Sequence, residues 1–116
     1  MNGLTARGLE ELAWEVHESA VLHGWWPDGT RNFGENIALC HSELSEALEA
    51  YREGFDVQAL WEEDDGKPEG VATEFADCII RILDLCVGLN IPIVEALWRK
   101  VEYNKRRAYR HGGKRA

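Results

Sequence analysis

Apolar residues recur at intervals of three and four along most of this chain, a spacing that places them on one face of an α-helix. Four such stretches are each followed by a glycine, a residue that commonly ends a helix. The stretches cover residues 5–23, 32–53, 68–87 and 92–109, and the glycines are Gly24, Gly54, Gly88 and Gly112. No stretch alternates in the manner of a β-strand. The pattern therefore predicts one all-α domain over residues 1–116, built as an antiparallel four-helix bundle.

Residues at the expected helix ends support these boundaries. Thr5 is a suitable N-cap for the first helix, and Asn32 with Glu35 approximates a capping box for the second. Pro68 suits the first position of the third helix. Before it, residues 55–67 are expected to form a connection with a short helical turn at 57–61 and an acidic loop.

The third helix is apolar on almost every side, which is typical of a buried helix. A single polar seam interrupts it, and the seam contains Glu74, Asp77, Arg81 and Asp84. A bundle of this size cannot cover such a helix alone. We therefore expect a second copy of the chain to cover it, giving a helical homodimer or a dimer of dimers.

Charge divides the chain into an acidic body and a basic end. The net charge is −8, but residues 1–98 hold five Lys and Arg against twenty Asp and Glu, and residues 99–116 hold eight against one. The basic end, including a tail at about 110–116, fits either a solvated helix terminus or an anion site beside a metal site. The acidic body would repel a nucleic acid duplex, so we do not expect a nucleic acid partner.

The sequence lacks the features of a secreted or membrane protein. Met1 to Arg7 contains no apolar run, and Arg81 and Asp84 interrupt the best candidate for a membrane helix. We therefore expect a soluble, cytoplasmic protein with no membrane partner. The three cysteines form no CxxC pair and are expected to be buried free thiols.

Two pairs of carboxylates, each pair three residues apart, are the strongest chemical feature. Glu43 and Glu46 form one pair and Glu74 and Asp77 the other, and this spacing puts both members on one helix face. Carboxylates at an apolar surface are costly unless a cation compensates them. Mg²⁺ prefers oxygen ligands, so the two pairs on facing helices predict a magnesium site, with Mn²⁺ as a possible substitute. No histidine has a glutamate three residues before it, which disfavours a di-iron site.

A polar and basic face on the fourth helix is the candidate for binding an anionic substrate. Lys100, Asn104 and Arg107 share this face, and Lys105 lies at the other edge of the apolar stripe. Asn104 interrupts that stripe, and an amide there needs hydrogen-bond partners. A structural asparagine bonded to helix backbone is the alternative explanation.

Taken together, these motifs resemble the MazG-like all-α nucleoside triphosphate pyrophosphohydrolases, which are related to dimeric dUTPases and dCTP pyrophosphatases. The family pattern, E-E-x-x-E followed after a gap by E-x-x-D, corresponds here to residues 42–46 and 74–77. Residues 39–52, 67–81 and 102–114 are similar to the second helix, the start of the third helix and the C-terminal end of small family members. The similarity covers roughly residues 20–115. One departure is that Ser42 replaces the first glutamate, which leaves open the number of metals and the rate.

The resemblance implies Mg²⁺-dependent hydrolysis of a nucleoside triphosphate to the monophosphate and pyrophosphate, in nucleotide-pool housekeeping. It implies Glu43, Glu46, Glu74 and Asp77 as metal ligands, with Glu43 or Glu46 also activating water. Substrate phosphates or sugar would contact residues of the fourth helix, from the same or the partner subunit. Trp25 or Trp26 would stack on the base, and packing residues are the alternative explanation for these two side chains. The substrate-binding candidates are Lys100, Asn104, Arg107, Lys105, Trp25 and Trp26.

Two alternatives remain open at this point. One is a non-catalytic nucleotide-binding or regulatory module with the same fold, which Ser42 keeps plausible. The other is a purely structural helical dimer. The sequence does not specify the base, the sugar or the choice between dimer and tetramer.

Overall fold

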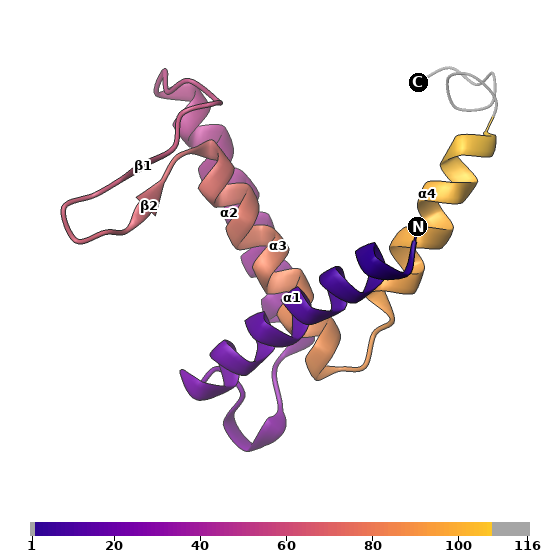
Figure 1. Cartoon of the computed structure of the whole chain (residues 1–116). Coiled ribbons are helices and arrows are strands. Elements are labelled where there is room, and N and C mark those ends of the chain that lie inside the picture. Colours follow the sequence, from indigo (N-terminus) through magenta and orange to yellow (C-terminus); the bar gives the residue numbers. More distant parts are fainter. Residues whose placement is uncertain (1, 108–116) are drawn as a thin grey trace.

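Four helices account for most of the residues that the computed structural model describes, which are 2–107 (Figure 1). The helices are α1 (Gly3–Leu22), α2 (Phe33–Arg52), α3 (Val71–Gly88) and α4 (Ile93–Arg106). A short 3₁₀ helix, η1 (Pro27–Gly29), follows α1, and the strands β1 (Trp61–Glu62) and β2 (Pro68–Glu69) precede α3. The largely helical class predicted from the sequence is confirmed. The expected end of the fourth helix at Tyr109 and the basic tail at 110–116 lie outside the described residues.

The start of α2 is as predicted, and the start of α1 is not. The Asn32 side chain accepts a hydrogen bond from the backbone N–H of Glu35 at 2.8 Å, as an N-cap does. At α1 the cap is Asn2, whose side chain accepts from the N–H of Thr5 at 2.9 Å, so Thr5 lies inside the first turn. The helix extends further toward the N-terminus because asparagine is as good a cap as threonine and lies three residues earlier.

The segment before α3 is a β-hairpin, so the predictions of a helical turn at 57–61 and of a helix beginning at Pro68 were wrong. β1 and β2 pair antiparallel, with Trp61 opposite Glu69. The physical reason lies at Gly70, whose φ of +128° only glycine adopts readily and which therefore interrupts any helix entering from Pro68. A Cβ atom at Gly70 would also lie 2.4 Å from the carbonyl oxygen of Ala59. The third helix therefore begins at Val71, with Glu74 in its first turn.

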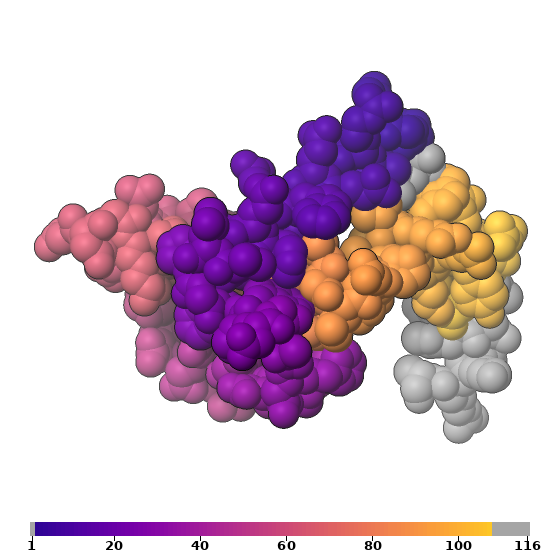
Figure 2. Space-filling model, turned by 90° about the horizontal axis from the view of Figure 1, so that it is seen from below, coloured from indigo at the N-terminus to yellow at the C-terminus, as the bar shows by residue number. Residues whose placement is uncertain are grey.

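α2 and α3 lie side by side and run in opposite directions, and α1 crosses the C-terminal half of α3 (Figure 1). α4 leaves this assembly and makes few contacts, mainly with α1, so the four helices of one chain do not close into a bundle. Figure 2 shows α4 projecting from the body of the molecule beyond the α3–α4 connection. The radius of gyration is accordingly 16.9 Å, against about 13 Å expected for a compact domain of this length.

The core of one chain is small, and much of it consists of small side chains. Its buried apolar residues are Ala13, Trp26, Cys40, Ala47, Val71, Cys78, Leu83, Leu85, Cys86 and Val94. The three cysteines are buried free thiols, as predicted. None of the described helices combines the length and hydrophobicity needed to cross a bilayer.

Candidate metal centre

The facing surfaces of α2 and α3 bring three carboxylates together. Glu43 and Glu46 lie one turn apart on α2, and Glu74 lies in the first turn of α3. Each of the three offers a carboxylate oxygen, and these oxygens lie within 4.8 Å of one another. The two helices run in opposite directions, which places the start of α3 beside the second half of α2. Three of the four predicted metal ligands therefore converge.

Asp77, the fourth predicted ligand, lies beside this cluster and not within it. It is half-buried and borders the same pocket as Glu43. Burial and the charge of Glu43 raise the pKa of Asp77, although Arg81 opposes this effect. Asp77 is thus close enough to Glu43 for their charges to interact, without sharing the point of convergence.

Glu74 carries the clearest sign that the carboxylates of the cluster repel one another. Burial raises its pKa from 4.5 to about 7, and the carboxyl groups of Glu46, Glu43 and Asp77 add to the effect. Its Oε2 atom is buried and has no hydrogen-bond partner among the described residues. A proton or a bound cation would relieve this repulsion. An all-oxygen donor set with an unsatisfied carboxylate oxygen fits a hard divalent cation such as Mg²⁺ or Mn²⁺.

Arg81 belongs to the site, although its position in the sequence alone assigns it no role there. Its Nε–H donates to Glu43 Oε1 at 3.0 Å, joining α3 to α2. Glu43 is 9% exposed, so this ion pair is largely shielded from solvent. The polar seam of the third helix already contained Arg81. The pairing with Glu43 depends on the register between two helices, which the sequence does not specify.

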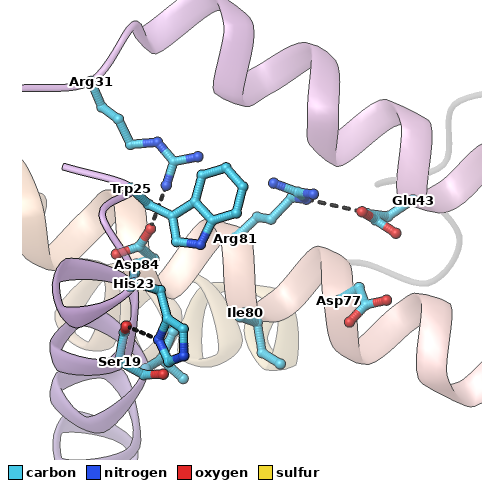
Figure 3. A pocket seen from close by; sticks show the side chains of 11 residues that line it. Ser19, His23, Trp25, Arg31, Glu43, Asp77, Ile80, Arg81 and Asp84 are labelled. Atoms are coloured by element: carbon cyan, nitrogen blue, oxygen red, sulfur yellow. Dashed lines mark hydrogen bonds and ion pairs between the residues drawn. The ribbon is translucent and has the colours of Figure 1, made fainter. Parts of the chain in front are cut away.

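A pocket of about 400 Å³ adjoins the cluster, between α1, α2, α3 and the α1–α2 connection (Figure 3). Glu43, Asp77 and Arg81 line the end nearest the carboxylates, and Trp25 and Arg31 line the opposite part. This volume lies in the range of small-molecule sites. The pocket therefore contains an aromatic ring and two guanidinium groups together with Glu43 and Asp77, two of the four predicted metal ligands.

A buried carboxylate fixes the α1–α2 connection beside this pocket. Asp84 is 4% exposed and accepts hydrogen bonds from His17 Nδ1, Trp26 Nε1 and Arg31 Nη1, each at 2.8 Å. Trp26 is itself buried, and a Cβ atom at Gly88 would lie 2.1 Å from its ring. Trp26 is therefore a packing residue and not an accessible stacking surface. Trp25 is 58% exposed and remains accessible to a ligand.

The predicted basic face of α4 is not near the carboxylate cluster of its own chain. Lys100, Asn104, Lys105 and Arg107 are all exposed, and none lines either of the two pockets that the carboxylates border within residues 2–107. Lys105 pairs with Glu102 at 3.2 Å, while the cationic groups of Lys100 and Arg107 lie 5.0 and 5.8 Å from the Tyr103 ring. These residues can reach a carboxylate site only in another subunit or after α4 moves.

No family model, curated protein or solved structure matches this chain. The MazG-like family resemblance therefore stays a prediction from the sequence motifs.

Proposed function

We propose that this protein is a divalent-cation-dependent nucleoside triphosphate pyrophosphohydrolase. The observation that carries the proposal is the convergence of Glu43, Glu46 and Glu74 within 4.8 Å, with a buried Glu74 oxygen that lacks a partner among the described residues. With a divalent cation bound at the carboxylates, the adjoining pocket of about 400 Å³, with its two arginines and Trp25, would suit an anionic ligand with an aromatic base. The family resemblance supplies the reaction class.

Glu43, Glu46 and Glu74 would hold the cation. Asp77 lies beside Glu43 and would coordinate the cation after a small side-chain movement, or through a bridging water. When bound, Mg²⁺ neutralises phosphate charge and orients a water for attack. Water oxygen would bond to the α-phosphorus, the bond from that phosphorus to the bridging oxygen would break, and pyrophosphate would leave. The proton released by water would pass to a carboxylate of α2. Glu46 suits this role because it forms no ion pair with the described residues, whereas Glu43 is paired with Arg81.

The proposed active form is a homodimer. Large apolar side chains are exposed along every helix, including Trp14 on α1, Leu48 on α2, Ile79 on α3 and Val101 on α4. Such exposure is unusual for a monomer and typical of an oligomer interface. In the dimer, α4 of one subunit would bring Lys100, Asn104 and Arg107 to the phosphates bound by the other.

Mixing two inactive variants tests this shared site. Glu46→Gln and Asn104→Ala would each be inactive alone or nearly so. If each site combines residues from two subunits, mixed dimers contain one intact site and recover activity. Sedimentation analysis of each sample establishes that dimers are present. A monomeric protein, or dimers that never complement, would overturn the shared-site arrangement.

A pyrophosphate-release screen tests the catalytic proposal. Ordinary and damaged deoxy- and ribonucleoside triphosphates are incubated with the protein and Mg²⁺ or Mn²⁺. At least one is expected to release pyrophosphate, and Glu46→Gln and Asp77→Asn are expected to abolish the release with the helical circular dichroism spectrum retained. Glu18→Gln, a change at an exposed glutamate of α1, is the matched control. No release from any nucleotide would contradict the enzymatic proposal.

A non-catalytic nucleotide-binding module is the second candidate. Ser42 occupies the position of the first glutamate in the family pattern, and it is exposed on α2. The site therefore has one acid fewer than that pattern. Calorimetric binding of a nucleotide that is never hydrolysed would favour this candidate.

A further inference from the structure

Two arginines and three carboxylates share the pocket beside the candidate metal centre. Arg31 and Arg81 contribute the positive charges, and Glu43, Asp77 and Asp84 the negative ones (Figure 3). Without a metal, this excess of carboxylates disfavours an anionic ligand. A doubly charged cation at the carboxylates would reverse the balance.

The positive charge of Arg81 neutralises Glu43 in this structure. Glu43 is 9% exposed, and a buried carboxylate is costly unless it is paired. Its Oε1 atom accepts from Arg81 Nε at 3.0 Å, so the arginine neutralises the same carboxylate charge that would attract a divalent cation. The Arg81 side chain is 30% exposed, which leaves it room to move into the pocket. A cation at Glu43 and the Arg81 contact therefore compete.

Arg31 marks the part of the pocket where Arg81, once displaced from Glu43, would contact the phosphate groups of a ligand. Arg31 is held by Asp84 through Nη1, at 2.8 Å, and its guanidinium carbon lies 5.8 Å from the centre of the Trp25 ring. Both arginines line the same pocket, and each donates through a single nitrogen in the hydrogen bonds among the described residues. Their remaining N–H groups match the geometry of phosphate oxygens.

We propose that Arg81 is an exchangeable counter-charge that couples metal binding to phosphate binding. It neutralises Glu43 in the metal-free protein. Once a divalent cation takes Glu43, the Arg81 guanidinium turns to the phosphate groups of a ligand in the pocket, beside Arg31. This inference rests on the proposed function for the metal centre, and it assigns Arg81 as a positioning and binding residue.

The coupling has a signature that a purely structural arginine would not give. Replacing Arg81 by glutamine removes the competitor for Glu43, so affinity for the metal alone rises, while affinity for a phosphate ligand in the presence of metal falls. The Arg81 side chain is 30% exposed, so its pair with Glu43 is worth on the order of 1 kcal/mol, which predicts roughly fivefold tighter Mn²⁺ binding. The lost charge-assisted hydrogen bonds predict about tenfold weaker phosphate binding.

Two calorimetric titrations on the full chain test the inference. The first titrates Mn²⁺ alone, and the second titrates the Mn²⁺ complex of inorganic tripolyphosphate into protein already saturated with Mn²⁺. Arg81→Gln is expected to change the two affinities in opposite directions. Arg99→Gln removes an exposed Arg–Glu pair on α4, where the N–O distance is 2.7 Å, and is expected to change neither. Arg81→Lys keeps the charge with fewer donors, so it should bind Mn²⁺ like the wild type and tripolyphosphate more weakly.

Unchanged or weaker Mn²⁺ binding in Arg81→Gln would overturn the inference while leaving the metal centre intact. Unchanged tripolyphosphate binding in that variant would also overturn it. If Arg81→Gln does not fold, the Arg81→Lys variant tests the inference. Tripolyphosphate affinity equal to that of the wild type in this variant would contradict phosphate binding by the Arg81 guanidinium. A wild-type protein that binds no Mn²⁺ would instead remove the metal centre, and the proposed function would fail with it.

Discussion

Replacing Glu74 by glutamine is expected to stabilise the metal-free protein at pH 8, although most substitutions destabilise. Burial and the carboxyl groups of Glu46 and Glu43 raise the pKa of Glu74 from 4.5 to about 7. Between these values the folded protein holds a proton at Glu74 that the unfolded chain has released. Because the folded state binds more protons in this window, its stability is greatest below it and falls as the pH rises through it.

The pKa of Glu74 sets the size of this effect. A shift from 4.5 to about 7 corresponds to about 3 kcal/mol, at about 1.4 kcal/mol per pH unit. Glu74 is only half-buried, and solvent screening reduces the expected loss to about 1–2 kcal/mol. Glutamine carries no charge at any pH, and its amide can donate to the carboxylates of Glu46 or Glu43. The free energy of unfolding of Glu74→Gln should therefore not fall at high pH as that of the wild type does.

Urea unfolding in EDTA at pH 5 and pH 8 measures this difference. At pH 8 the Glu74→Gln variant should be more stable than the wild type by about 1–2 kcal/mol, and the gap should narrow at pH 5. Glu18→Gln should follow the wild type at both pH values. Added Mg²⁺ should stabilise the wild type more than Glu74→Gln, which lacks a ligand. A variant that is less stable than the wild type at pH 8 in EDTA would refute the reasoning.

Two further predictions concern the packing that holds the pocket in shape. Gly88→Ala should destabilise the fold by about 1–3 kcal/mol in urea titrations, because its Cβ would lie 2.1 Å from the Trp26 ring. Gly8 lies in α1, and a Cβ atom there would have no neighbour within 4 Å, so Gly8→Ala should leave the stability unchanged or raise it. Equal changes in stability for Gly88→Ala and Gly8→Ala would contradict the packing argument. Asp84→Asn should cost about 3–5 kcal/mol in thermal or urea unfolding, because it leaves the guanidinium of Arg31 buried without its counter-charge. A loss below about 1 kcal/mol would show that this contact is not a shielded ion pair.

The parts of the fold that the sequence predicts well are those set by local chemistry. Asn32 and Glu35 mark the start of α2 because the cap requires only neighbouring residues. Helical spacing puts each carboxylate pair on one helix face, and three of the four carboxylates converge. The hairpin before α3 was missed because two-residue strands have no periodicity, and because the positive φ of Gly70 depends on a close approach to Ala59.

The parts that the sequence leaves open depend on how the elements pack. Trp25 and Trp26 are neighbours with the same chemistry, and only the space at Gly88 and the contact with Asp84 decide which of them is buried. Arg81 and Glu43 are 38 residues apart along the chain, and their pairing depends on the register between α2 and α3. The position of α4 is not encoded in its amphipathic pattern, which specifies an apolar face but not the surface that covers it.

The most direct test of the proposed reaction is ³¹P NMR of its products in water enriched in ¹⁸O. A nucleoside triphosphate identified in the screen is incubated with the protein and Mg²⁺. Attack of water on the α-phosphorus predicts a nucleoside monophosphate that carries the label, together with unlabelled pyrophosphate. Formation of nucleoside diphosphate and inorganic phosphate, or the label in pyrophosphate, would contradict the proposal.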